Sequence, residues 1–282
     1  MNENSVASDW ASARGEKWRR QVAGMEAMLA PVDEPLIGAL DLGQPYKIAD
    51  IGCGGGGTTL KILRQSPAGS VVRGFDISPA LIELARARAE SVVGDITFEV
   101  RNMAMAAAPD RGYDRLVSRF GIMFFDDAPG AFANLLRWLA PGGRFAFAAW
   151  GPMAENPWIT TVRDVVAEVI ETPRPDPDAP GPFRYGDADK LVTLLKECGF
   201  DELQVRDWRG TLSIGGQLHA EEAAKFALAS FSTFSEQLAE AGEKAAEDAR
   251  AALTRRFSPH EQNGAVRMDA RVHIFTGMRP LS

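Results

Sequence analysis

A run of glycines behind a short apolar segment is the feature that most limits how this chain can fold. Residues 47–51 predict a buried strand, and Gly52 to Gly57 follow it, interrupted only by Cys53. Residues 58–65 then predict a helix. Such a strand–glycine–helix unit brings the backbone close to a ligand, as in nucleotide-binding sheets. The sequence therefore predicts an α/β fold with a cofactor site at this turn.

The alternation of strands and helices continues through residue 150. Ser78 and Pro79 predict the start of a helix, and Pro141-Gly142-Gly143 predicts a tight turn before the fifth strand. Further strands are expected at 71–76, 96–100, 114–118 and 144–150, and a helix over 128–139. This β-α alternation is typical of a parallel sheet with helices on both faces.

The second half of the chain is less regular. Five prolines between residues 172 and 182 predict a stiff loop. Residues 219–257 are rich in alanine and charge, so we expect helices that interrupt the sheet between its last two strands. The other elements expected are helices from 156 and over 187–198, and strands at 203–208 and 266–275.

Composition excludes several classes of protein. The net charge is −7 and no basic run offsets it, so nucleic acid is not expected as the main partner. Cys53 and Cys198 are the only cysteines; they form neither a disulfide framework nor a metal set, which favours a reducing, cytoplasmic setting. Charges within the first thirty residues argue against a signal peptide, and no apolar run is long enough for a membrane span.

The glycines alone leave the cofactor open. Gly52, Gly54 and Gly57 match the dinucleotide pattern G-x-G-x-x-G, with Asp76 about 20 residues later to hold a ribose, so an NAD-dependent oxidoreductase is one reading. Asp50, two residues before Gly52, favours S-adenosylmethionine instead. A carboxylate there would repel a pyrophosphate, whereas it can bind the ammonium of a methionine moiety.

Five stretches in order resemble the class I S-adenosylmethionine-dependent methyltransferases, in particular their small-molecule branch. They are residues 48–56, 74–79, 101–104, 113–118 and 139–144. The resemblance implies a Rossmann-like, doubly wound, mostly parallel sheet of seven strands with an antiparallel last strand and a helical cap. The expected parts are an N-terminal helical segment or lid (1–44), a cofactor-binding core (45–150), and the remaining core strands with cap insertions (151–282, with the insertions at about 151–198 and 211–264).

The resemblance also implies individual roles. Asp76 should accept both ribose hydroxyls, since one carboxylate can take two O–H donors. Asn102 and Met103 match the positions that contact adenine, although the family usually has an acidic residue where Asn102 stands. Ser118 to Phe120 should border the methyl-donor pocket. The expected cofactor site comprises Asp50, Gly52, Cys53, Gly54, Gly56, Asp76, Ile77, Asn102, Met103, Ser118 and Phe120.

No residue stands out as catalytic, because methyl transfer chiefly needs positioning, and a base only for some acceptors. His273 is expected to be structural, and His219 and His260 to be at the surface. Asp126-Asp127 could hold Mg²⁺ but more simply cap a helix, so no metal site is predicted. Aromatic and arginine side chains beyond the strand ends predict the acceptor wall: Trp18, Arg119, Phe124, Trp150, Trp158, Tyr185 and Phe231.

The predicted function is methylation of a small, partly apolar metabolite at O, N, C or S. Two alternatives stay open: a methyltransferase-like protein that binds the cofactor without turnover, and the oxidoreductase. The apolar stripe at Phe226, Phe231, Phe234 and Leu238 should pack on the sheet domain or on a second subunit, so the cap helices could also pair as a homodimer.

Overall fold

The computed structural model describes residues 6–172, 176–230 and 232–281, apart from the side chains of residues 232 and 233. Its strands are β1 (Lys47–Ile51), β2 (Val71–Asp76), β3 (Asp95–Val100), β4 (Tyr113–Arg119), β5 (Leu139–Trp150), β6 (Asp201–Ser213), β7 (Glu261–Gln262) and β8 (Ala265–Met278). Its α-helices are α1 (Val6–Ala11), α2 (Ala13–Leu29), α3 (Asp33–Gly38), α4 (Gly57–Gln65), α5 (Pro79–Ala89), α6 (Ala128–Trp138), α7 (Pro157–Val169), α8 (Ala188–Glu197), α9 (Ala220–Ser230), α10 (Ser232–Ala241) and α11 (Glu243–Phe257).

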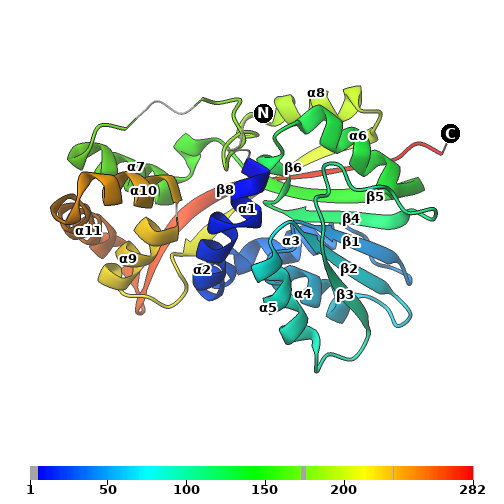
Figure 1. Cartoon of the computed structure of the whole chain (residues 1–282), viewed down its shortest axis with the longest axis horizontal. Helices are drawn as coiled ribbons and strands as arrows, with labels where there is room; N and C mark the ends of the chain where they lie inside the picture. Colours follow the sequence, from blue (N-terminus) through cyan, green and yellow to red (C-terminus); the bar gives the residue numbers. More distant parts are fainter. Residues whose placement is uncertain (1–5, 173–175, 231, 282) are drawn as a thin grey trace.

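The main sheet runs in the order β3-β2-β1-β4-β5-β8-β6, and β7 pairs with β8 at its far end. Strands β1 to β5 are parallel, whereas β8 is antiparallel to both β5 and β6. Helices α6 and α8 lie on one side of the sheet and α3, α4 and α5 on the other (Figure 1). The predicted doubly wound, mostly parallel fold with an antiparallel last strand is therefore confirmed, with the short β7 as an addition.

Helix boundaries follow the local signals. The Ser78 hydroxyl accepts a hydrogen bond from the Leu81 N–H, and Pro79 opens α5, as predicted. Asp127 caps α6 through the Gly130 N–H. The Pro141-Gly142-Gly143 turn was expected to precede the fifth strand, but β5 begins at Leu139 and contains it as a bulge. Gly142 there has φ +75°, which allows the extra residues to loop out.

Strands β6 and β8 are much longer than predicted and pair from Asp201 to Ser213. Their far ends extend beyond the parallel strands and carry the cap helices α7, α9, α10 and α11 at the left of Figure 1. Since β6 reaches Ser213, the sheet continues into the start of the range 211–264 expected for the cap. Within the range 151–198, α8 lies against β6 with the sheet helices and not with the cap.

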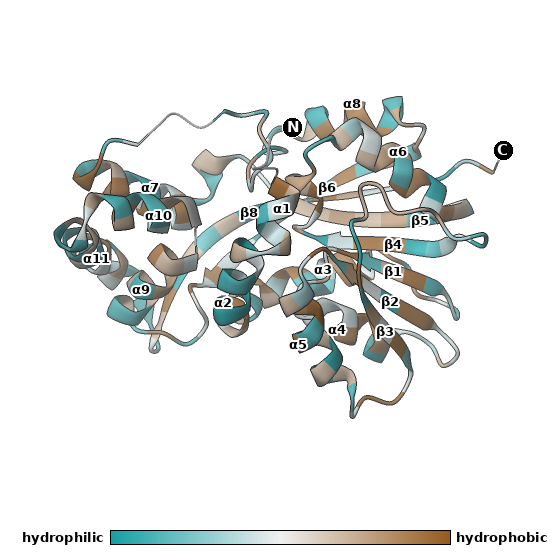
Figure 2. Cartoon of the chain, viewed as in Figure 1, coloured by the Kyte–Doolittle hydropathy of each residue, from teal (hydrophilic) through white to brown (hydrophobic). Residues whose placement is uncertain are grey.

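The apolar cores of the sheet and the cap form one continuous buried cluster. Phe226 of α9 packs against Gly24 of α2, where a Cβ atom would come within 2.5 Å of the Phe226 ring. Phe226 and Leu238 are buried, so the predicted stripe packs within the chain, although Phe231 lies outside the described residues. The charged residues of α11, from Glu243 to Arg256, are exposed, and the ribbon of this helix is largely hydrophilic in Figure 2.

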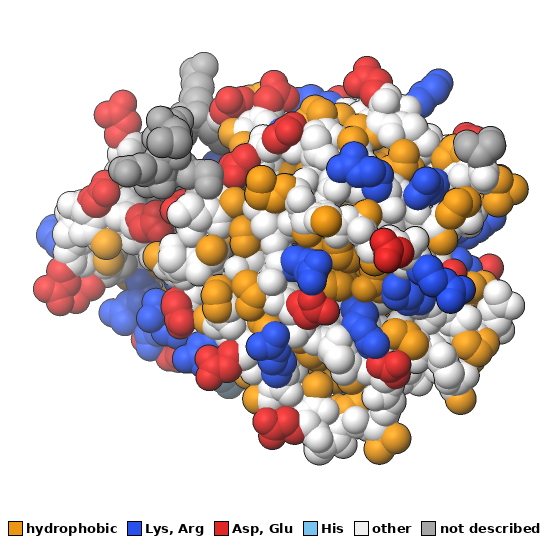
Figure 3. All heavy atoms as spheres, turned by 45° about the vertical axis from the view of Figure 1, so that its right-hand side comes forward, with side chains coloured by type: hydrophobic (Ala, Val, Ile, Leu, Met, Phe, Trp, Pro, Cys, Tyr) orange, Lys and Arg blue, Asp and Glu red, His pale blue; other side chains and the backbone are white. Residues whose placement is uncertain are grey.

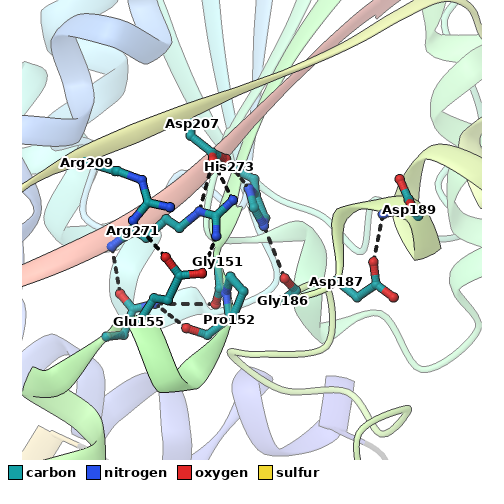
Figure 4. Close-up of polar contacts among 11 residues, drawn as sticks. Gly151, Pro152, Glu155, Gly186, Asp187, Asp189, Asp207, Arg209, Arg271 and His273 are labelled. Carbon is teal, nitrogen blue, oxygen red and sulfur yellow. Dashed lines mark hydrogen bonds and ion pairs between the residues drawn. The ribbon is translucent and has the colours of Figure 1, made fainter.

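A polar network ties the cap to the long strands. Asp207 of β6 accepts hydrogen bonds from Arg271 Nε at 2.9 Å and pairs with His273 Nδ1 at 2.7 Å, both on β8. Figure 4 shows Asp207 and Glu155 converging on Arg271, with His273 between Asp207 and the Gly186 carbonyl. Burial acts to raise the pKa of Asp207, but the hydrogen bonds from Arg271 and His273 outweigh it and lower that pKa.

Replacing Asp207 with Ala should cost about 2–3 kcal/mol of unfolding free energy in urea denaturation, because charged hydrogen-bond partners lose their shared acceptor. Since the folded pKa is lowered, this contribution is present above the usual carboxyl pKa and disappears as acid titrates the folded state. Glu202→Ala is the control on the same strand. Its ion pair with Arg144 is exposed on both sides, so it should change stability by less than about 0.5 kcal/mol. Equal losses in the two variants would contradict the role of the network.

Candidate functional site

A large cavity lies at the carboxyl ends of the parallel strands. Its volume is about 1150 Å³, and its walls come from the ends of β1, β2, β4 and β5, the N-terminal helices and the cap. Sites for one drug-sized ligand usually measure about 300–1,000 Å³. The cavity therefore has room for a cofactor and a second small molecule side by side.

The glycine turn forms one wall. Gly52, Gly54 and Gly56 have φ values of +69°, +55° and +80°, a region in which other residues are strained. A Cβ atom on Gly54 would point into the cavity, with only Trp18 Nε1 at 4.0 Å. A Cβ on Gly56 would instead meet Phe98 and Ala85 at 2.9–3.0 Å. Gly52, Cys53 and Gly54 line the cavity. Gly56 was expected to line it as well, but it packs against Phe98 and Ala85 instead.

Asp76 ends β2 with its carboxylate at the cavity. One oxygen accepts the Gly54 N–H and the other the Ser78 N–H, each at 2.9 Å. A carboxylate has about four lone-pair positions, so both oxygens can still take an O–H donor. Burial raises the pKa of Asp76, and the backbone hydrogen bonds act against that rise. This geometry fits the vicinal hydroxyls of a ribose, and the neighbouring Ile77 also lines the cavity.

Asp50 lies at the end of β1 and is only 1% exposed. Its carboxylate accepts the Thr59 hydroxyl at 2.7 Å. Burial raises its pKa to about 7, while the Thr59 hydrogen bond and the charge of Arg119 act to lower it. A buried carboxylate with this pKa can change its charge near neutral pH, and a cationic group in the cavity would favour its ionised form.

Arg119, which the sequence placed on the acceptor wall, has its charge paired within the protein. Its guanidinium donates to Asp33 Oδ1 at 2.9 Å, and both side chains are largely buried. Asp33 also accepts Thr58 Oγ1 at 2.9 Å and pairs with Lys61. Arg119 thus lines the cavity with its charge already paired.

The loop after β3 brings Asn102 and Met103 to the cavity, as expected. The Asn102 side chain accepts the Ala104 N–H at 3.0 Å. Asn134 of α6 donates to the carbonyl oxygens of Met103 and Ala106, each at 2.9 Å. These contacts fix the loop where the resemblance places adenine.

The residues after β4 divide into two roles. Ser118 does not line the cavity; it is fully buried and donates its hydroxyl to the Ile51 carbonyl at 2.7 Å, which joins β4 to β1. Phe120 lines the cavity with φ +63° and stacks on Trp150 at a centroid distance of 4.4 Å. A phenylalanine at positive φ is strained, and such strain is common in binding sites.

Aromatic rings cover the wall opposite the glycine turn. Of the residues expected there, Trp18, Phe124, Trp150 and Trp158 line the cavity, together with Trp10, Phe125, Phe183 and Phe234. Tyr185 is buried against Phe132 and lies outside this cavity. Phe231 lies outside the described residues. The wall is therefore largely apolar and suits a flat or hydrophobic ligand.

The N-terminal helices close the cavity in a way that the sequence did not define in detail. Asp126 accepts the N–H groups of Val6 and Ala7 at 3.1 and 3.2 Å, which holds α1 over the opening. Gly15 allows α2 to approach α5, because a Cβ there would lie 2.2 Å from the Ser78 hydroxyl. The pair of tryptophans around Gly15 was the available signal for this contact.

None of the three histidines lines the cavity. His273 is 3% exposed and bonded within the network of Figure 4, as expected of a structural histidine. His219 is exposed and contacts Glu261. Across the described ranges, no group of three or more His, Cys, Asp and Glu side chains is arranged to hold a metal ion.

Comparison with known proteins agrees with this geometry. The family model for a methyltransferase domain matches residues 48–143. An aklanonic acid methyltransferase of Streptomyces sp. (strain C5) is 31% identical over 44% of this chain and 54% of its own length. Phosphoethanolamine N-methyltransferase 3 of Arabidopsis thaliana is 32% identical over 60% of this chain and 31% of its own length. The chain thus spans about half of the first relative and a third of the second.

Solved structures share the fold at low identity. A phosphoethanolamine N-methyltransferase 2 of Haemonchus contortus, in complex with S-adenosyl-L-methionine, aligns with a TM-score of 0.60 at 14% identity over 99% of this chain and 61% of that one. The YcgJ protein of Bacillus subtilis aligns with a TM-score of 0.58 at 16% identity, covering 88% and 97% of the two chains. The matched stretch contains the glycine turn, Asp50, Asp76 and the loop of Asn102 and Met103. Residues 48–143 of this chain therefore form a methyltransferase domain of the class I S-adenosylmethionine-dependent family.

Proposed function

We propose that the chain transfers a methyl group from S-adenosylmethionine to a small, largely apolar acceptor. One observation carries the proposal: a single cavity joins Asp50, Gly54 and Asp76 on one wall to a wall of aromatic rings on the other. The names of the relatives include methyltransferases of aklanonic acid and of phosphoethanolamine, which supports a small-molecule acceptor.

The residues present fit the cofactor. The Asp76 carboxylate has lone pairs left for two hydroxyls, and the open space above Gly54 is what a side chain would fill. Asp50 would attract the ammonium of the methionine part, and Asn102 and Met103 would border the adenine. When bound, S-adenosylmethionine supplies the activated methyl group and its leaving group.

The chain itself contributes positioning and the exclusion of water. The rings of Phe120, Trp150 and Trp158 would hold the acceptor against the methyl group, while α1 and the cap close the cavity. The acceptor atom stays open among O, N, C and S, because no histidine lines the described walls and Asp50 faces the cofactor side. We further propose that the protein acts in the reducing cytoplasm without nucleic acid, and that a homodimer could form through the cap.

Two measurements test this function. Isothermal titration should show binding of S-adenosylmethionine and no binding of NAD(H), and candidate acceptors should yield S-adenosylhomocysteine. Binding of NAD(H) without S-adenosylmethionine would overturn the proposal in favour of an oxidoreductase. Cofactor binding without turnover across a broad acceptor panel would favour a binding protein.

Asp76→Ala should weaken S-adenosylmethionine binding by roughly one to two orders of magnitude. The variant removes the charged acceptor of the ribose hydroxyls, and hydrogen bonds to charged groups contribute about 1.5–3 kcal/mol. Calorimetry measures the dissociation constant, and circular dichroism checks that the fold is retained. An unchanged dissociation constant would refute the role of Asp76.

Gly54→Ala and Gly56→Ala should separate binding from folding. Both positions have positive φ, so backbone strain should lower the unfolding free energy of each variant by about 1–2 kcal/mol. The Gly54 methyl would enter the cavity and should weaken cofactor binding at least tenfold. The Gly56 methyl would press on Phe98 and should lower the melting temperature further. Thermal melts and binding titrations of both variants test this. If Gly54→Ala mainly lowered the melting temperature and Gly56→Ala mainly weakened cofactor binding, the roles assigned to the two glycines would be wrong.

Cofactor affinity should rise with pH around neutrality. The pKa of Asp50 is raised to about 7, so the carboxyl is protonated below that pH and only its ionised form attracts the cofactor's ammonium. Below pH 7 the affinity should fall by up to about tenfold per pH unit. Asp50→Asn should bind more weakly at pH 8 and lose this dependence between pH 6 and 8. A persisting dependence in the variant would assign it to another group.

The same shift affects stability in the opposite sense. Because the folded Asp50 holds its proton more tightly than the unfolded chain does, its contribution to stability is present in acid and declines as the pH rises from about 4 to 7. The difference in unfolding free energy between wild type and Asp50→Asn, measured at pH 5 and pH 8, should follow this decline.

A further inference from the structure

Three buried polar atoms of residues that line the cavity have no hydrogen-bond partner among the described residues. They are Trp10 Nε1 of α1, Ser230 Oγ at the end of α9, and Gln237 Oε1 of α10. All three residues line the one large cavity, on the side formed by the N-terminal helices and the cap. Buried polar atoms are nearly always paired in native proteins, so three orphans in one cavity point to a partner that the described residues do not supply.

The elements that carry these atoms are held in place. The Trp10 ring packs edge-on against Trp18 and Phe124, at centroid distances of 5.6 and 5.1 Å. Lys17 of α2 donates to Ser235 of α10 at 2.7 Å, which ties the N-terminal helices to the helix that carries Gln237. The three atoms therefore belong to a preorganised wall.

The arginines near this wall already have partners, which argues against an anionic acceptor. Arg14 pairs with Asp9 and stacks over Trp10, and Arg163 contacts Asp164. Arg119 is paired with Asp33, as described above. The nearby carboxylates are committed as well, Asp126 to α1 and Asp127 to the cap of α6. Among the described lining residues, the uncommitted groups of this wall are neutral ones.

The donor and acceptor types of the three atoms select the ligand group. Trp10 Nε1–H can only donate, and Gln237 Oε1, as oriented, can only accept, while the Ser230 hydroxyl can do either. A carbonyl would leave Gln237 unpaired, and an ammonium would leave Trp10 unpaired. A hydroxyl can both accept and donate, so it is the neutral group that suits either atom.

We propose that Trp10, Ser230 and Gln237 form a recognition site for a hydroxyl group on an uncharged, aromatic methyl acceptor. This inference rests on the proposed function and names the chemical class of its substrate. None of the three side chains is a base near neutral pH, so the hydroxyl that they bind stays protonated. It anchors the acceptor, and the three are positioning residues.

The test uses the full chain saturated with S-adenosylhomocysteine, with 2-naphthol and naphthalene as probes in equilibrium titrations. Wild type should bind 2-naphthol at least tenfold more tightly than naphthalene. Trp10→Phe, Ser230→Ala and Gln237→Met should each weaken 2-naphthol binding by about three- to tenfold, the effect of one lost hydrogen bond, and leave naphthalene binding unchanged. Phe234→Leu is the control: it alters the apolar wall and should weaken both probes alike.

The outcomes separate the two proposals. If S-adenosylhomocysteine does not bind, the proposed function fails. If it binds but 2-naphthol does not, or if wild type binds both probes equally, the recognition site is overturned while the function stands. The same holds if the three variants weaken both probes in parallel, because a purely structural role of these residues would produce that pattern. Unchanged affinity for S-adenosylhomocysteine in every variant confirms that the cofactor wall is intact.

Discussion

Close backbone packing at the end of β1 is the constraint on which the rest of the site depends. The turn after this strand passes within van der Waals distance of the β4 loop, since a Cβ on Gly52 would lie 3.0 Å from the Gly121 Cα. Gly52 and Cys53 both donate to the Phe75 carbonyl, and Gly54 donates to Asp76. The left-handed glycines are thus what allows the ends of three strands to meet at one point.

This convergence brings carboxylates together, and their charges have to be compensated. Asp50 and Asp76 end β1 and β2, where burial raises the pKa of both carboxyls, and the charges of Asp33 and Asp76 add to the rise at Asp50. Arg119, from the end of β4, pairs with Asp33 and also lowers the pKa of Asp50 through its charge. The arginine therefore stabilises the acidic side of the cavity, which explains why it is not free to bind an acceptor. A cationic cofactor would complete this compensation.

The sequence predicted the parallel half of the fold well because its signals are local. Strand–glycine–helix spacing, the Ser78 cap and the Asp127 cap depend on residues only a few positions apart. The residues proposed to bind the cofactor were also predicted from local signals, because Asp50, Gly54 and Asp76 lie at or just after the ends of predicted strands. Gly56 and Ser118 match the family pattern equally well, but their contacts are with Phe98 and the Ile51 carbonyl, and only the tertiary structure shows that they face away from the cavity.

The acceptor wall was less accessible to prediction because it is assembled from distant segments. Helix α1 is held by Asp126, about 120 residues away, and α10 is held by Lys17 over a separation of 218 residues. The extended pairing of β6 and β8 determines where the cap lies, and β6 does not show its full length in its hydrophobic pattern, because it is an exposed edge strand. Tyr185 also illustrates the limit: an aromatic residue in the right loop packs against Phe132 instead.

The outer face of the molecule and the lining of the cavity differ in character. Lys, Arg, Asp and Glu side chains are interspersed with hydrophobic ones on the face in Figure 3, so on that face no single sign of charge dominates. Within the described ranges, moreover, no helix combines the length and hydrophobicity that a bilayer crossing requires. The observations that bear on an acceptor lie instead in the lining of the cavity. In the proposed function, charged and backbone groups at the strand ends would face the cofactor there, whereas rings and neutral polar atoms from separate segments would face the acceptor.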